Sequence, residues 1–194
     1  DVSSQVPQTF YALDRNADNL TKKAIRDFIH LRRGDYLVGN VPGQHACELP
    51  SQSLNAVSDI GMIMAYAWFS GDLSVLELAY PAIKNYLNLW EITSDGRLIA
   101  RKGDWQWYDH QNAIDGEVLE YGWYLLALTG AKRMAQMLSL PDVAEYDMKI
   151  SALRYTASRL FWDGAGFRSE SFAARQGNLY DDRAQALAIL SGIA

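Results

Sequence analysis

The sequence contains a single cysteine, Cys47, among 194 residues. One thiol cannot close a disulfide within the chain, and it cannot supply the clustered thiolates of a structural zinc site. His45 lies two residues before Cys47, but that spacing is poor for a pair of metal ligands, and no further ligand is evident nearby. We therefore expect neither a metal site nor a cofactor, and we interpret Cys47 as a small packed thiol.

Positive charge is also scarce, because 18 Lys and Arg stand against 23 Asp and Glu. The basic residues are scattered, so we expect no nucleic-acid partner. No run of about 18 apolar residues occurs, which argues against a membrane-spanning helix and a membrane partner. Residues 1–5 do not resemble a signal peptide and no initiating Met is present, so we expect a removed leader or a piece of a longer chain. A periplasmic or extracellular location is slightly favoured.

Apolar residues, by contrast, are plentiful, at 49% of the chain, with six Trp and eleven Tyr. Their spacing predicts helices over residues 2–13, 17–31, 51–69, 73–92, 116–140, 142–162 and 179–192. We expect a short strand at 97–100 and a hairpin or loop at 165–174. Three helix pairs and an unpaired seventh helix, separated by long loops, favour an all-α solenoid or toroid built from antiparallel hairpins.

One predicted loop, residues 103–110, concentrates functional side chains. Asp104, Trp105, Trp107, Asp109 and His110 lie in the run Gly-Asp-Trp-Gln-Trp-Tyr-Asp-His. A pyranose stacks its apolar face on an indole while carboxylates bind its hydroxyls, so this mixture is typical of carbohydrate binding. The alternative is that Trp105 and Trp107 plug the end of a helix bundle, with Asp109 as a turn residue and His110 as a structural donor.

Other carboxylates admit a simpler interpretation than catalysis. Glu117 and Glu120 share one face of the predicted helix 116–140, and Asp109 and Asp115 flank them. Carboxylates at the start of a helix interact favourably with its dipole. That role suffices for Glu117, and for the pair Asp181 and Asp182 before the last helix.

Several stretches, taken in order, resemble the catalytic domain of α-L-rhamnosidases, glycoside hydrolase family 78, a family of six-hairpin glycosidases. The resemblance implies an (α/α)6 toroid and inverting hydrolysis of terminal α-L-rhamnosyl or related residues, without a metal for the chemistry. The stretches are Trp-Phe-Ser-Gly-Asp at 68–72, Tyr-Pro-Ala-Ile at 80–83, Asp-Gly at 95–96, Gly-Asp-Trp at 103–105, residues 131–144 with Leu-Pro-Asp at 140–142, and Asp-Asp-Arg-Ala-Gln-Ala-Leu-Ala at 181–188 followed by Ser-Gly-Ile at 191–193.

The resemblance also implies roles for particular residues. Trp105 matches an indole that lines the family's sugar pocket, with Asp104 beside it, and Asp1 matches a hydroxyl-binding carboxylate. The family's general acid would lie before residue 1 and its general base after residue 194, so the native domain is expected to continue in both directions. A second pocket Trp of the family has no counterpart in residues 49–54, which leaves the exact sugar open.

Two hypotheses from other functional classes remain open. A non-catalytic α-helical carbohydrate-binding or scaffold protein would need no acid and base. A helical-repeat interaction protein predicts that the Trp-rich loop is buried or turned away from any cleft. An interrupted toroid would expose apolar faces of its inner helices, so self-association is a further expectation.

Overall fold

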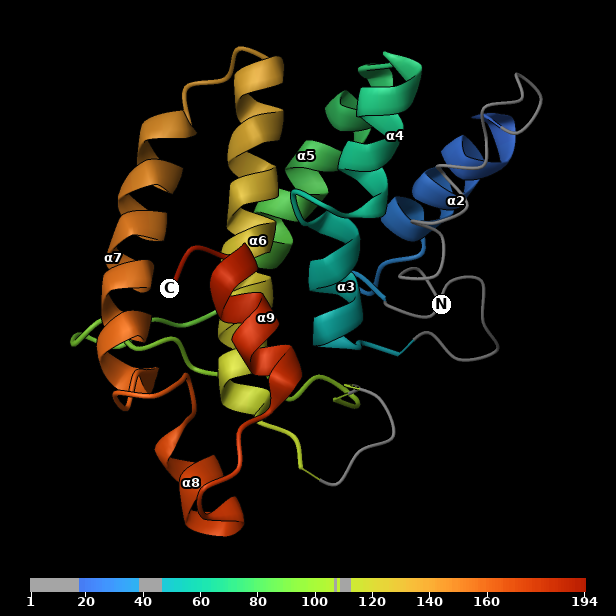
Figure 1. Ribbon diagram of the computed structural model, residues 1–194. Coiled ribbons are helices and arrows are strands. Elements are labelled where there is room, and N and C mark those ends of the chain that lie inside the picture. The colour runs from blue at the N-terminus through green and yellow to red at the C-terminus, as the bar shows by residue number, and fades with distance from the viewer. Residues whose placement is uncertain (1–17, 39–46, 107, 109–112) are drawn as a thin grey trace.

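The structure is a computed structural model that describes residues 18–38, 47–106, 108 and 113–194. Over these residues the protein is all-α, as predicted, with three isolated bridges and no strand (Figure 1). None of the described helices is long and apolar enough to cross a membrane. The helices are α2 (Asp18–His30), α3 (Pro50–Val57), α4 (Met62–Ser70), α5 (Ser74–Leu87), α6 (Gly116–Met137), α7 (Val143–Phe161), α8 (Glu170–Gln176) and α9 (Asp182–Leu190).

The long periodic segments form the helices that the pattern predicted. The predictions for 17–31, 73–92, 116–140, 142–162 and 179–192 correspond to α2, α5, α6, α7 and α9, with ends that differ by a few residues. In α2, Ile25 and Phe28 are fully buried, but Leu20, expected on the same face, is exposed. The predicted helix at 2–13 lies outside the described residues.

The single helix predicted over residues 51–69 is wrong, because the chain breaks between α3 and α4 at residues 58–61. The break lies against α6, where the Asp59 N–H donates to the Leu126 carbonyl over 3.1 Å. The approach is close, since a Cβ on Gly130 of α6 would lie 2.6 Å from the Val57 oxygen. Both halves bury apolar residues, so the apolar spacing continues across the break and conceals it.

Two short segments also differ from prediction. Residues 165–174 contain the start of α8, where the Ser169 side chain accepts a hydrogen bond from the Phe172 N–H over 3.1 Å. Seven residues are too few for apolar periodicity to reveal a helix, but the Ser cap is a recognisable start signal. Residues 97–100 form only an isolated bridge, between Ile92 and Leu98.

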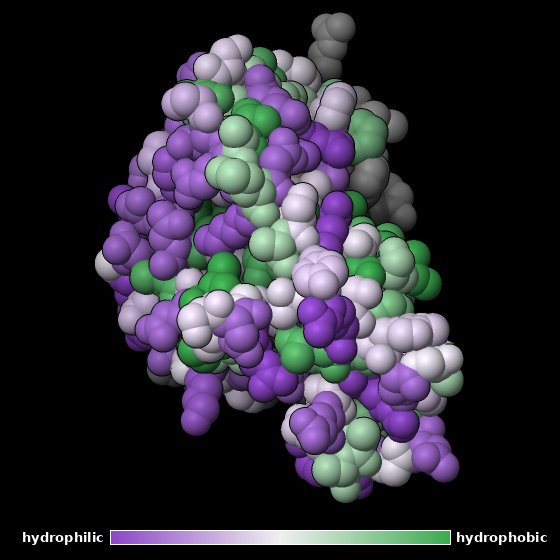
Figure 2. Space-filling view, turned by 90° about the vertical axis from the view of Figure 1, so that its left-hand side faces the viewer, coloured by the Kyte–Doolittle hydropathy of each residue, from purple (hydrophilic) through white to green (hydrophobic). Residues whose placement is uncertain are grey.

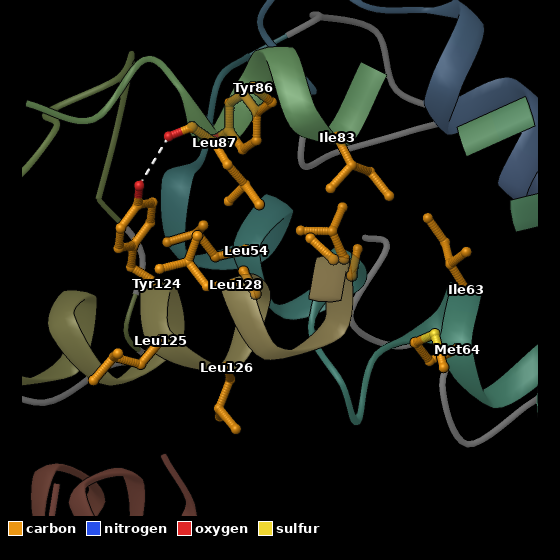
Figure 3. Close-up of a cluster of buried hydrophobic side chains, with 14 of the residues drawn as sticks. Leu54, Ile63, Met64, Ile83, Tyr86, Leu87, Tyr124, Leu125, Leu126 and Leu128 are labelled. Atoms are coloured by element: carbon orange, nitrogen blue, oxygen red, sulfur yellow. Dashed lines mark hydrogen bonds between the residues drawn. The ribbon is translucent and has the colours of Figure 1, made fainter. Parts of the chain in front are cut away.

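Helix α6 lies at the centre, packed against α3, α5, α7 and α9. Helices α3, α6 and α9 begin at the same end of the molecule, the lower end in Figure 1, and α7 runs in the opposite direction. Figure 3 shows the core between α3, α5 and α6, where Tyr124 and Leu128 of α6 approach Leu54 of α3 and Leu87 of α5. The Tyr124 hydroxyl donates to the Leu87 carbonyl over 3.0 Å. The loops before α3, α6 and α9 are therefore brought to one end.

Candidate functional site

The segment before α6 is fixed to the segment before α3 by main-chain hydrogen bonds. The Asp104 and Trp105 N–H groups donate to the Glu48 carbonyl, over 3.0 and 3.4 Å. The Glu48 N–H returns a 2.7 Å hydrogen bond to Asp104 Oδ2. Gly103 makes this approach possible, because it has φ +56° and a Cβ there would lie 2.6 Å from Pro50 Cδ. The Gly-Asp-Trp run thus has a defined place at this end of the molecule.

Asp104 is partly exposed and partly committed to structure. Its Oδ2 also pairs with the Arg33 guanidinium, 2.7 Å away, and its side chain keeps 42% of its accessible surface. Among the described residues, both contacts fall on Oδ2. Asp104, Arg33, Tyr36, Glu48 and Arg101 line a cavity of about 440 Å³, so Oδ1 can meet a ligand hydroxyl there.

Trp105 is 58% exposed. The alternative interpretation, in which this indole plugs the end of a helix bundle, is therefore wrong for Trp105. An exposed indole offers a large flat surface for stacking, and only two side-chain torsions have to be ordered when a ligand binds it.

Glu48 also forms an ion pair with Arg101, in which the Glu48 side chain is buried and the Arg101 side chain is partly buried. The guanidinium NH2 lies 2.8 and 3.0 Å from the two Glu48 carboxylate oxygens. Its central carbon lies 5.2 Å from the ring centroids of both Tyr36 and Trp90. Removal of the Arg101 guanidinium would leave the buried Glu48 carboxylate without this ionic partner, which is destabilising.

Glu120 of α6 is the second buried carboxylate below this segment, with 2% of its surface exposed. Its Oε1 accepts hydrogen bonds from Trp90 Nε1 over 2.8 Å and from the Arg101 N–H over 2.6 Å. Its Oε2 accepts one from Gln106 Nε2 over 3.1 Å. Burial raises the pKa of Glu120 from 4.5 to about 7, against the opposing effect of these donors. Glu117, on the same helix, has its pKa raised by partial burial.

A second cavity, of about 460 Å³, is lined by side chains of α3, of the N-terminal part of α6 and of α9, together with Tyr108. Helix α3 contributes amides, while α6 and α9 contribute mainly apolar side chains, an arrangement that suits a ligand with one polar and one apolar face. Within the part of the chain that the structure describes, the buried Gln52 amide oxygen has no hydrogen-bond partner. The lining includes Ser51, Gln52, Asn55, Tyr108, Leu119, Trp123, Arg183, Leu187 and Leu190.

Asp115 and Asp181 join the starts of α6, α8 and α9. Asp115 caps α6 and also accepts the Ser169 N–H over 2.6 Å. Asp181 caps α9 and accepts the Asp115 N–H over 3.0 Å and Arg183 Nε over 2.8 Å. The helix-start interpretation is confirmed for Asp181. Asp115 has the same role, because its side chain caps α6.

The surface on the side of α7 carries both hydrophilic and hydrophobic residues. Figure 2 views the side of the molecule at the left of Figure 1, where α7 lies, and shows hydrophilic residues over much of it with hydrophobic residues in separate patches. Exposed apolar side chains also occur on α9, at Ile189 and Leu190. Self-association stays a prediction.

Two of the predicted site residues, Asp104 and Trp105, lie within the described part of the chain, next to each other in the sequence. The others, Asp1, Trp107, Asp109 and His110, lie outside the described residues. Sequence reasoning did not find Glu48, Arg33 or Gln52, which carry no motif. Across the described ranges, no group of three His, Cys, Asp or Glu side chains is arranged to hold a metal ion.

Comparison of the chain with models of protein families, with curated proteins and with solved structures finds no match.

Proposed function

We propose that this chain is part of an (α/α)6 glycosidase domain that hydrolyses terminal α-L-rhamnosyl or related residues with inversion. In this proposal the Asp104–Trp105 segment binds the sugar, and the acid and base come from outside residues 1–194. The proposal rests on the sequence resemblance together with the site geometry.

The order of the helices supports a toroid. Helices α3, α6 and α9 pack as α3 on α6 and α6 on α9, while α5 and α7 also pack on α6. An inner row of helices that start at one end, joined through outer helices, is the arrangement from which a ring of hairpins is built. The loops that precede the inner helices then meet at one rim.

The observation that carries the proposal is the exposed Trp105 indole beside the partly exposed Asp104 carboxylate, both fixed by Glu48. The indole offers a stacking face, and the carboxylate accepts hydrogen bonds from hydroxyls. A helical-repeat interaction protein predicts this segment buried or away from a cleft, whereas Asp104 lines one.

The inverting mechanism assigns separate tasks to separate parts of the protein. One carboxylic acid protonates the glycosidic oxygen while a second carboxylate, about 6.5–9.5 Å away, activates water on the opposite ring face. Glu48, Asp115, Glu120 and Asp181 are buried and already accept hydrogen bonds, so neither role is given to them. Asp104 and Trp105 orient the sugar for the attack.

The test is hydrolysis of p-nitrophenyl α-L-rhamnoside by the full protein that carries this chain. We expect Trp105→Ala to lower kcat/KM by about 100-fold, because a misplaced ring loses alignment with acid and base. Trp68→Ala is the matched control, since Trp68 is 59% exposed on α4, and it should keep wild-type activity.

The outcomes separate the classes of protein. Saturable sugar binding that depends on Trp105, without hydrolysis of this or other p-nitrophenyl glycosides, would support the non-catalytic carbohydrate-binding alternative. Absence of both binding and hydrolysis would contradict a carbohydrate function.

A further inference from the structure

The Trp105 segment, residues 101–106, is attached to helix α6 through the buried side chain of Glu120. Glu120 holds the Arg101 N–H at the start of the segment and the Gln106 amide at its end, and the same carboxylate holds the Trp90 indole after α5. Trp105 lies between these two attachment points. A change at Glu120 therefore acts on both sides of the exposed indole.

The charge of Glu120 is not balanced by a direct ion pair among the described residues. The Arg101 guanidinium acts on Glu120 electrostatically, but it is bound to Glu48. The phenols of Tyr86 and Tyr108 interact with the Glu120 charge, and burial keeps their pKa values well above 10, so they stay neutral. The three described donors that hold Glu120 are neutral N–H groups. When the Glu120 carboxyl group gains or loses a proton, none of these donors changes its own charge in response.

We propose that Glu120 is a positioning residue, and that the place of the Trp105 indole depends on whether the Glu120 carboxyl group is ionised. This inference concerns the segment itself, and only its consequence for sugar binding rests on the proposed function.

The hydrogen bonds of Gln106 give the physical link. Its Nε2 donates both to Glu120 Oε2 and to the Arg101 carbonyl, and its Oε1 is buried with no hydrogen-bond partner among the described residues. A proton on Oε2 removes the acceptor for Nε2. If the Gln106 amide then turns so that Oε1 accepts that proton, the bond to the Arg101 carbonyl is lost. Either response costs Gln106 one hydrogen bond, directly next to Trp105.

The pKa of about 7 places the change near neutral pH. Above it the ionised carboxylate holds all three donors and fixes the segment. Below it the segment is held less firmly at Gln106. We expect ligand binding through Trp105 to weaken as the pH falls from 8 to 5.5.

The test follows the tryptophans directly, without a sugar. The protein is labelled with 5-fluorotryptophan, and its ¹⁹F resonances are assigned with Trp90→Phe and Trp105→Phe. In the wild type, the Trp90 and Trp105 resonances should shift together with a midpoint near pH 7. Both steps should disappear in Glu120→Gln and remain in Glu117→Gln, a control three residues earlier on α6.

A second variant separates positioning from simple titration. Gln106→Ala should keep the Trp90 step and abolish the Trp105 step. A Trp105 resonance that does not follow Trp90 in the wild type would overturn the proposal, as would a step that persists in Glu120→Gln. If Glu120→Gln does not fold, Gln106→Ala still tests the proposal. A Trp105 step that persists in Gln106→Ala would overturn it. Failure to bind rhamnosides, with these steps present, would count against the proposed function alone.

Discussion

Two carboxylate-rich junctions lie at the same end of the molecule, and they behave differently. At the junction of α6, α8 and α9, Asp115 and Asp181 are buried, with Asp181 paired to Arg183, and both cap helices. At the Trp105 segment, Glu120 is buried with neutral donors, while Asp104 and Trp105 remain exposed. The first junction is built for stability. The second presents side chains to a ligand and leaves one carboxylate free to titrate.

We expect the largest loss of stability at Asp181. Asp181→Ala removes the cap of α9, the partner of Arg183 and the acceptor of the Asp115 N–H. We expect a loss of about 3–5 kcal/mol in the free energy of unfolding, measured by urea denaturation. Asp182→Ala, at the neighbouring exposed position, should change it by less than about 0.5 kcal/mol. Equal losses of unfolding free energy in Asp181→Ala and Asp182→Ala would show that the junction of α6, α8 and α9 does not provide this stability.

A smaller effect depends on pH and belongs to Glu120. Its pKa is raised from 4.5 to about 7 in the folded protein, so folding takes up a proton between these values. The contribution to stability is therefore full below pH 4.5 and is lost as the pH rises towards 7. The difference in unfolding free energy between wild type and Glu120→Gln should fall by about 3 kcal/mol over this range. A constant difference would contradict a raised pKa.

The next largest loss of stability is expected at Gly103. Gly103→Ala places a Cβ at φ +56° and 2.6 Å from Pro50 Cδ, so we expect a loss of about 1–3 kcal/mol in unfolding free energy. Gly71→Ala is the matched control, since Gly71 has φ +71° with open space around it. It should cost less than Gly103→Ala, because only the backbone strain is shared. Equal losses would mean that the contact with Pro50 is relieved elsewhere.

The smallest stability effect should be at Trp105. Because the indole is 58% exposed, Trp105→Ala should alter the unfolding free energy by no more than about 0.5 kcal/mol. A much larger loss in urea denaturation would return Trp105 to the role of a core plug.

The sequence predicts the long helices well and the contacts at the site poorly. Helices such as α6 and α7 have enough periodic apolar residues to be recognised, whereas α8 is too short and the break at residues 58–61 is set by packing against α6. Asp104 and Trp105 stand out because their composition suits a sugar. Their partners Glu48 and Arg33 are 56 and 71 residues away from Asp104, so only the fold reveals them. Glu120 was visible as a carboxylate on a helix face, but its burial, which raises its pKa, is set by the fold and is not visible in the sequence.

The measurement that tests the central claim most directly is calorimetric titration of the protein with methyl α-L-rhamnoside at pH 8. We expect saturable binding. Trp105→Ala should weaken it by at least about tenfold, a loss of about 1.4 kcal/mol in binding free energy, and Trp68→Ala should leave it unchanged. Saturable binding of equal strength in wild type and Trp105→Ala, or no binding of any saccharide tested, would contradict it.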